Sequence, residues 1–313
     1  MSETLTRTAV GYRGDPSVAC LPLMLATPAL FAVNMVTARW AEGAAIPPLF
    51  LAFGRWTLAF LIMLPVSAPG LWAWRHVLLA NRWRLLLLAG LGMGVAVGPQ
   101  YIGARDTSAA NIALIFAACP MFVGLLESVL WKAPLGRQRG FGMLLSCCGV
   151  LVVVTGGKCL VPEHFSFGRG DLWVLCAAGG WALYTVLGKR QPLPPLPCAV
   201  RLTALIGSGA LLLAPFALLE TLGGALPDFG DPRLYAALGL LAAVPSLGAY
   251  FCYDRLVSQV GATGASVSMY MVPLYATLAA WPLLGEAPAL FHAAGLGLIL
   301  GGVLFAGMHR HRG

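Results

Sequence analysis

Long apolar stretches alternate with short polar ones along almost the whole chain. Most of the apolar stretches are about 20 residues long, which lets a helix rising about 1.5 Å per residue cross a hydrocarbon core of roughly 30 Å. Backbone groups in lipid must be satisfied within the spanning segment, so the pattern predicts an all-α membrane protein with about ten transmembrane helices. The expected spans fall near residues 18–38, 48–68, 85–104, 108–130, 140–156, 172–188, 199–218, 234–253, 260–281 and 289–308.

Composition agrees with this pattern. Of the 313 residues 59% are hydrophobic and 10% are charged, and the mean hydropathy is +0.81. No stretch outside the expected spans is large enough to fold as a soluble catalytic domain. Residues 1–17 are polar and lack the apolar core and small-residue cleavage site of a signal peptide, so we expect them to form a cytoplasmic tail.

Lys and Arg are distributed unevenly over the expected loops, and this orients the chain. Arg55 falls inside a span, and most of the other basic residues lie on the side that holds both termini. The positive-inside rule therefore places both termini in the cytoplasm of an inner-membrane protein. The net charge of +8 reflects topology, and we expect no nucleic-acid partner because no compact basic patch remains. Five basic residues fall on the other side: Arg39, Arg105, Lys158, Arg169 and Arg233.

The sequence offers little for catalysis. Its eight cysteines form no CxxC pair and lie mostly within expected spans, so we interpret them as core residues. We find no HExxH motif, nucleophile elbow or phosphate loop, and the acidic residues are scattered. We therefore expect no cofactor, no metal site and no enzymatic activity. A membrane-embedded enzyme or a receptor is the alternative class.

The two halves of the chain resemble each other. SAANIALIFAACPMF (108–122) aligns with GATGASVSMYMVPLY (261–275), and the same shift aligns GFGMLLSCCGVLVV (140–153) with AAGLGLILGGVLFA (293–306). A looser match joins FAVNMVTAR (31–39) to WALYTVLGK (181–189). Each half holds five expected spans, and because five is odd the halves enter the membrane from opposite sides.

This duplication predicts two inverted five-helix repeats, an arrangement that many secondary transporters use to alternate between two states. The expected repeats cover residues 18–156 and 172–308, with a periplasmic linker at 157–171 and a cytoplasmic tail at 309–313. The first alignment superposes Pro120 on Pro273. We interpret these prolines as hinges, and passive bends in packed helices are the alternative.

Several of these segments resemble the drug/metabolite transporter superfamily, and in particular its ten-helix EamA-like members. The resemblance implies a transporter of small metabolites, often amino acids and usually exported, with the substrate in a central cavity between the repeats. Members usually carry a glutamate after the fourth helix, as Glu286 follows the ninth here, but the equivalent residue is Ala133. The segments that carry the resemblance are VNMVTARW, IPPLFLAFGRWTLAF, GDLWVLCAAGGWALYTVLGKR, GATGASVSMYMVPLYATLAAWPLLGE and AAGLGLILGGVLF.

Polar and aromatic residues inside the spans are candidates for substrate contacts. Polar side chains are costly in lipid and tend to face the bundle interior, and helical spacing puts several of these residues on shared faces. Packing or an interfacial belt is the alternative for each aromatic residue. The candidates are Asn34, Gln100, Asn111, Trp181, Tyr184, Tyr250, Tyr253, Ser266 and Tyr270.

Two charged residues inside spans are candidates for an ion or a charged substrate group. The Arg55 guanidinium suits a carboxylate or phosphate, but we favour its snorkelling to headgroups or a structural pair. Glu127 suits a proton or cation, or an ion pair with Lys132 or Arg137.

The leading interpretation is a secondary transporter that exports an amino acid or an amino-acid-derived metabolite by alternating access. Amides, hydroxyls and aromatic rings suit a zwitterion with a partly apolar side chain, and an opine-type metallophore is a variant. The alternatives are a multidrug or cation efflux carrier, which is disfavoured because the first span holds no acidic residue, and a metabolite importer. Proton coupling, and a monomeric or homodimeric state, are left open.

Overall fold

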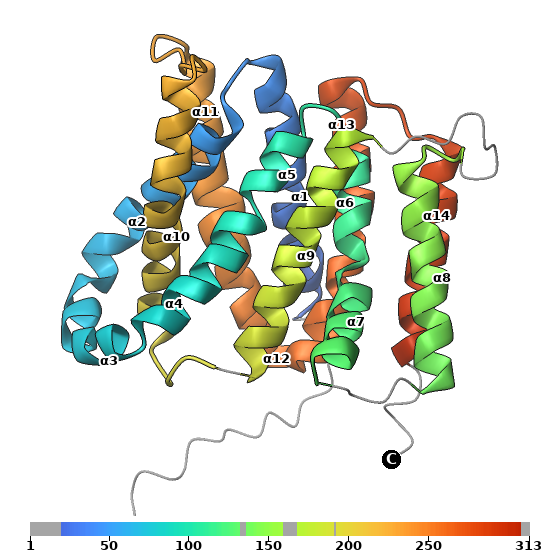
Figure 1. Ribbon diagram of the computed structural model, residues 1–313, viewed down its shortest axis with the longest axis horizontal. Coiled ribbons are helices and arrows are strands. Elements are labelled where there is room, and N and C mark those ends of the chain that lie inside the picture. The colour runs from blue at the N-terminus through green and yellow to red at the C-terminus, as the bar shows by residue number, and fades with distance from the viewer. Residues whose placement is uncertain (1–19, 132–135, 159–167, 191, 308–313) are drawn as a thin grey trace, which may run out of the picture.

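The computed structural model describes residues 20–131, 136–158, 168–190 and 192–307 (Figure 1). Every regular element in these ranges is a helix. The side chains of some helical residues, Ser266 among them, lie outside the description. The all-α class is confirmed.

Among the described residues, six helices or helix runs are long and apolar enough to cross a membrane. Three shorter apolar helices of this part of the chain accompany them: α8 (Arg137–Val154), α13 (Val272–Leu284) and α14 (Leu290–Gly307). A bent pair, α6 (Ala109–Ala117) and α7 (Cys119–Trp131), passes the same test as one broken span. The six are α1 (Leu21–Gly43), α2 (Pro48–Ala73), Arg82–Gly103, the Arg169–Lys189 part of α9 (Arg169–Arg190), α10 (Cys198–Leu222) and Pro232–Leu256.

Two of these runs contain a π-helical segment, which the hydropathy pattern did not predict. The first run consists of α4 (Arg82–Ala89), η1 (Gly90–Val95) and α5 (Gly98–Gly103). In the second, α11 (Pro232–Leu241) passes through η3 (Ala242–Gly248) into α12 (Ala249–Ser268). Three glycines in η1 and Pro245 in η3 weaken regular α-helical bonding there. Such wide turns often occur at functional sites.

The expected spans at 234–253 and 260–281 are not separated by a break in the helix. Helix α12 runs through residues 254–259 without a break, and the chain becomes irregular only at the 3₁₀ turn η4 (Met269–Met271). Polar residues such as Asp254 and Gln259 suggest a loop in a hydropathy pattern, but they are compatible with a helix whose turns lie at the membrane surface. Helix α13 (Val272–Leu284) follows η4 directly.

Both predicted hinge prolines follow a helix irregularity. Pro120 is the second residue of α7, after a 40° bend between α6 and α7, and Pro273 is the second residue of α13, after η4. In the first turn of a helix the missing N–H of proline needs no partner. The prolines therefore begin new helical segments, and the backbone accepts them without losing an internal hydrogen bond.

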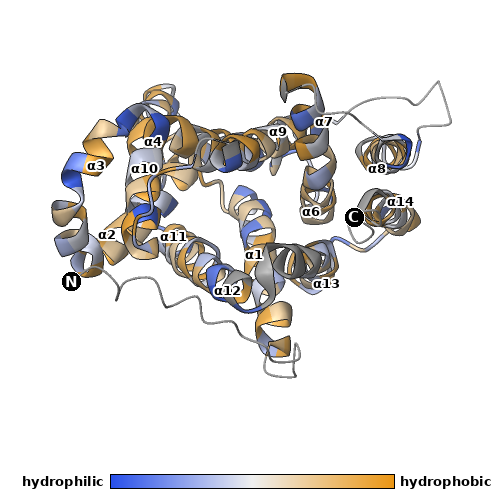
Figure 2. Cartoon of the chain, turned by 90° about the horizontal axis from the view of Figure 1, so that it is seen from below, coloured by the Kyte–Doolittle hydropathy of each residue, from blue (hydrophilic) through white to orange (hydrophobic). Residues whose placement is uncertain are grey.

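Helix α1 lies in the middle of the bundle, between α9 and α12 (Figure 2). The helices α8 (Arg137–Val154) and α14 (Leu290–Gly307) pack mainly against each other at one side, and α2 pairs with α10 at the other. Glycines at 142 and 302 let the backbones of α8 and α14 approach closely.

The two ends of the bundle differ in charge. The short helix α3 (Arg75–Ala80) and the last residues of α9 lie at one end, which we call the basic end. There Arg84 Nη1 donates to the Pro192 carbonyl at 3.3 Å. At the opposite end, Arg39 near the end of α1 donates to the carbonyls of Ala104 and Arg105. Helix α9 begins at that same end, because Asp171 in its first turn binds Thr107. Helices α1 and α9 therefore run in opposite directions.

Candidate functional site

Arg55 and Trp56 on α2 lie between the two π-helical segments. Both side chains are buried, with Arg55 3% and Trp56 0% exposed. The Trp56 indole donates to the Met93 carbonyl in η1 at 3.0 Å, and Arg55 Nε donates to Ser246 Oγ in η3 at 2.6 Å. Each wide turn thus supplies one acceptor to this pair of residues.

Side chains from two further helices, α1 and α5, bind the Arg55 guanidinium. Its Nη1 donates to Asn34 Oδ1 at 2.5 Å and to the Tyr101 hydroxyl at 2.8 Å. Tyr101 in turn donates to Asn34 Oδ1 at 2.8 Å. The guanidinium carbon lies 4.3 Å from the Trp56 ring centroid, within cation–π range. These contacts hold Arg55 inside the bundle, so its guanidinium does not reach the headgroups, and structural contacts, the other favoured interpretation, are present.

Gln100 extends the same hydrogen-bonded group. Asn34 Nδ2 donates to Gln100 Oε1 at 3.3 Å, and both residues are buried. Asn34 and Gln100 were predicted as site residues, whereas Trp56 and Tyr101 were not. We call the set Asn34, Arg55, Gln100, Tyr101 and Ser246 the Arg55 cluster.

Aromatic rings line one side of the Arg55 cluster. The Tyr250 ring lies edge-on to Trp56, with 6.5 Å between centroids, and also packs on Phe31 at 5.7 Å. Tyr253 packs on the same phenylalanine at 6.4 Å. Two of the predicted aromatics therefore lie beside the cluster.

The remaining predicted aromatics lie on α9 and η4. Trp181 and Tyr184 pack together with ring centroids 5.3 Å apart. The Tyr184 ring lies against η1, where a Cβ at Gly92 would come within 2.8 Å of it. Tyr270 is half-buried on η4, and the Ser266 side chain lies outside the described residues.

Asn111 belongs to a second polar cluster near the opposite end. Its Nδ2 donates to Asp171 Oδ1 at 3.2 Å, and Thr107 donates to the same oxygen at 2.5 Å. His292 Nδ1 accepts the Ala289 N–H at 2.9 Å, so the ring is neutral and its Nε2 donates to Asn111 Oδ1 at 3.2 Å. Asn111 thus links α6, α9 and α14, and no bond joins it to the Arg55 cluster in the described part of the chain.

An ion pair lies at the opposite end of the bundle. Arg39 Nε lies 2.8 Å from Glu286 Oε1, and Glu286 Oε2 accepts the Ala109 N–H at 2.9 Å. Arg39 Nη1 also donates to the carbonyls of Ala104 and Arg105 at 3.0 and 2.9 Å. The pair thereby joins α1, the start of α6 and the segment after α13.

A second ion pair lies at the basic end. Lys189 Nζ on α9 lies 3.1 Å from Glu127 Oε1 on α7, and the Glu127 side chain is 11% exposed. The sequence suggested Lys132 or Arg137 as the partner of Glu127 and did not indicate Lys189. Lys132 lies outside the described residues. Because Lys189 and Glu127 are 62 positions apart, no local spacing in the sequence indicates this pair.

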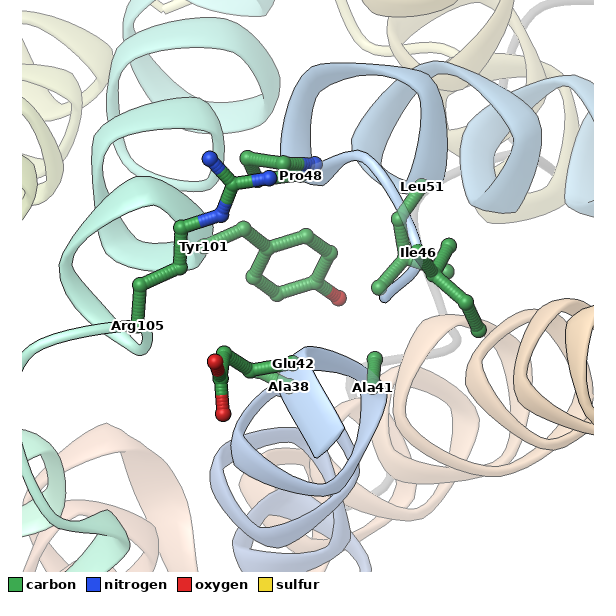
Figure 3. Close-up of a pocket in the computed structure, with 8 residues that line it drawn as sticks. All are labelled: Ala38, Ala41, Glu42, Ile46, Pro48, Leu51, Tyr101 and Arg105. Atoms are coloured by element: carbon green, nitrogen blue, oxygen red, sulfur yellow. The ribbon is translucent and has the colours of Figure 1, made fainter. Parts of the chain in front are cut away.

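A small crevice opens at the opposite end and leads to Tyr101 (Figure 3). Its walls come from α1, the start of α2 and α5, and Tyr101 reaches between them. Tyr101 therefore belongs both to this crevice and to the Arg55 cluster. The lining residues are Ala38, Ala41, Glu42, Ile46, Pro48, Leu51, Tyr101 and Arg105.

The helical bundle, its apolar spans and its buried polar centre define a multi-pass membrane protein of the transporter class. The chain belongs to the EamA-like transporter family, which matches residues 19–155 and again residues 168–308. It therefore falls within the drug/metabolite transporter superfamily.

Individual transporters and one solved structure are also similar to this chain. An uncharacterized transporter of Archaeoglobus fulgidus is 28% identical over 276 residues, which cover 85% of this chain and 90% of that protein. An S-adenosylmethionine/S-adenosylhomocysteine transporter of Chlamydia muridarum is 26% identical over 229 residues, 69% of this chain and 70% of its own. A crystal structure of another protein shares the fold, with a TM-score of 0.60 and 18% identity over 93% of this chain and 96% of its own.

Proposed function

We propose that the protein is a secondary transporter that exports an amino acid or an amino-acid-derived metabolite by alternating access, with its substrate at the Arg55 cluster. One observation carries this proposal. The cluster is buried and draws on both family matches, because Asn34, Arg55 and Tyr101 lie in the first match and Ser246 lies in the second. A site shared by two halves is accessible to each end of the bundle in turn when the halves rock.

The chemistry around the cluster suits a zwitterion. Amide, hydroxyl and guanidinium groups offer hydrogen bonds to a carboxylate, and the rings of Trp56 and Tyr250 offer cation–π contacts to an ammonium group. Relatives named as S-adenosylmethionine/S-adenosylhomocysteine transporters support this class, since both compounds are amino-acid derivatives. An opine-type metallophore fits the same chemistry.

Several features support ten spans in two inverted repeats, with the repeats at 18–156 and 172–308 and the linker at 157–171. The π-helical segments begin at Gly90 and Ala242, 152 positions apart. The break at Ala118 and the turn that begins at Met269 are separated by 151 positions. The opposite directions of α1 and α9 agree with inversion.

The two ion pairs suit the locks that alternating access requires. The alignment of FAVNMVTAR with WALYTVLGK superposes Arg39 on Lys189. Each of these residues lies near the end of the first helix of its half and pairs with a carboxylate of the other half, Glu286 or Glu127. The pairs lie at opposite ends of the bundle, so rocking of the halves opens one pair while the other stays closed.

We place the basic end in the cytoplasm of an inner-membrane protein, because arginines and lysines concentrate at cytoplasmic loops. A C-terminal green fluorescent protein fusion should then fluoresce, and a C-terminal alkaline phosphatase fusion should be inactive. The reverse pattern would contradict this orientation.

Transport itself is tested in proteoliposomes. A panel of the 20 standard L-amino acids, S-adenosylhomocysteine and several lipophilic cations would be loaded inside, and efflux would be measured by mass spectrometry against protein-free vesicles. We expect at least one amino-acid-type compound to leave chemically unchanged. Efflux of the cations alone would favour a multidrug carrier, and chemical conversion of a solute would favour an enzyme.

A further inference from the structure

We infer that Arg55 and Gln100 together form the binding site for an organic carboxylate group of the transported compound. The inference rests on the proposed function in that the compound passes the Arg55 cluster. It adds a substrate class, organic acids and zwitterions that carry a free carboxylate, and it names the residues that select for it.

The first argument is charge. An arginine stays protonated even when buried, and Arg55 is 3% exposed. None of the ion pairs between described residues includes it, and its hydrogen-bond partners among these residues are an amide and two hydroxyls. A buried charge without a counter-charge is costly. A ligand carboxylate would supply the missing negative charge.

The second argument is a surplus of hydrogen-bond donors. Asn34 Oδ1 and the Tyr101 and Ser246 oxygens already accept bonds from Arg55, and Gln100 Oε1 accepts from Asn34. Two donor groups of the cluster are left over. Arg55 donates to the described residues through Nε and Nη1, which leaves Nη2 for a further acceptor, and Gln100 Nε2 is buried without a hydrogen-bond partner. Both are donors, so the group that completes the cluster must accept hydrogen bonds.

The surrounding contacts fix the orientation of these donors. The Asn34 amide bonds Arg55 through its oxygen and Gln100 through its nitrogen, and thus holds the two side chains on one network. The Trp56 ring lies against the guanidinium. A planar guanidinium held in this way matches the two oxygens of a carboxylate better than a single point charge does.

The test compares each carboxylate with its carboxamide, which has nearly the same shape but no charge. Purified protein in detergent is titrated with the 20 L-amino acids, S-adenosylhomocysteine and their carboxamides, and affinity is taken from the concentration dependence of Tm. We expect at least one acid to bind and its carboxamide to bind about 10-fold or more weakly, as for loss of a hydrogen bond to a charged group.

Variants then assign the discrimination to the two residues. Arg55→Gln should bring acid and carboxamide to similar affinity, and Gln100→Leu should reduce the difference because it removes one hydrogen-bond donor to the carboxylate. Gln100→Glu should weaken binding of the acid further, because it places a competing carboxylate on the network. Arg201→Gln is the matched control: its side chain is 48% exposed and it faces Asp254 at 3.9 Å, so this variant should keep the preference. If Arg55→Gln does not fold, Arg55→Lys and the Gln100 variants carry the comparison.

Two results would overturn the inference. In one, wild-type protein binds acids and carboxamides equally or binds no acid at all. In the other, folded Arg55 and Gln100 variants keep the wild-type preference. Both results can be told apart from failure of the proposed function, because Tm titration measures binding without transport. The proposed function fails if no amino-acid-type compound leaves the proteoliposomes.

Discussion

Arg39 Nε lies 2.8 Å from Glu286 Oε1, across 247 positions of the chain. The side chains are 28% and 18% exposed, so water screens the pair only in part. Glu286 also accepts the Ala109 N–H, which fixes its carboxylate at the start of α6. The contact therefore joins the two family matches at the opposite end of the bundle.

Glu286→Gln should shift the protein toward the state that is open at the opposite end. We expect labelling of a cysteine at Ala38 or Ala41, in a cysteine-free background, to become about 3- to 10-fold faster, since a partly exposed pair contributes on the order of 1 kcal/mol. Glu42→Gln is the matched control, because Glu42 contacts the same arginine at 3.5 Å from a more exposed position. Equal labelling rates in the two variants would count against the lock.

Lys189→Gln should shift the protein toward the state that is open at the basic end, which is the reverse of the shift expected for Glu286→Gln. It removes the contact to Glu127 at the basic end, so that end should open more often and the opposite end should become less accessible. Cys252, retained as the sole cysteine, should label faster from the basic side, and cysteines at Ala38 or Ala41 should label more slowly. An increase at both ends would indicate general loosening and would contradict a pair of alternating locks.

Trp56→Ala should destabilise the protein strongly. The side chain is fully buried and donates to the Met93 carbonyl, and replacement of such a residue by alanine costs about 3–5 kcal/mol. Trp72→Ala is the control because its side chain is 70% exposed, and we expect a change of about 0.5 kcal/mol or less. Thermal unfolding in detergent measures both. Similar Tm values for the two variants would show that Trp56 does not hold α2 to η1.

Pro120→Ala and Pro273→Ala should leave the folded protein in the membrane but lower the rate of transport. Both prolines occupy the first turn of a helix, where alanine is well tolerated. We expect slower transport because alanine allows the preceding segment to join the helix, which makes the break between the two segments less mobile. Pro65→Ala is the control, because Pro65 is an exposed residue inside helix α2. Wild-type transport in both hinge variants would leave these prolines as packing residues.

The apolar pattern predicted the fold class and most of the spans because it depends on local composition. The burial of Asn34 and Gln100 was also anticipated, because amides that interrupt an apolar run tend to face the bundle interior. The sequence left the role of Arg55 open, because its distance from the end of a span does not tell which face of α2 turns inward. The Lys189–Glu127 pair was missed for a similar reason: its partners come from different halves and meet only in the folded bundle.

The π-helical segments were beyond the reach of hydropathy. GLGMGV and AAVPSLG are apolar and fit a regular span, and only the backbone shows that each forms a wide turn. These turns place Ser246 and the Met93 carbonyl against α2. The sequence therefore indicated which spans hold polar residues, but packing of the two π-helical segments against α2 determines how the Arg55 cluster is assembled.

The central claim is that the Arg55 cluster is reached from both ends of the bundle in turn. Ser246→Cys in a protein without its eight native cysteines tests this most directly, because Ser246 lies in the cluster and sulfur replaces the hydroxyl with little change in shape. A membrane-impermeant thiol reagent would be applied to oriented proteoliposomes from one side and then from the other. We predict labelling from each side, with Glu286→Gln and Lys189→Gln favouring opposite sides. Labelling from one side only, or from neither, would contradict the account.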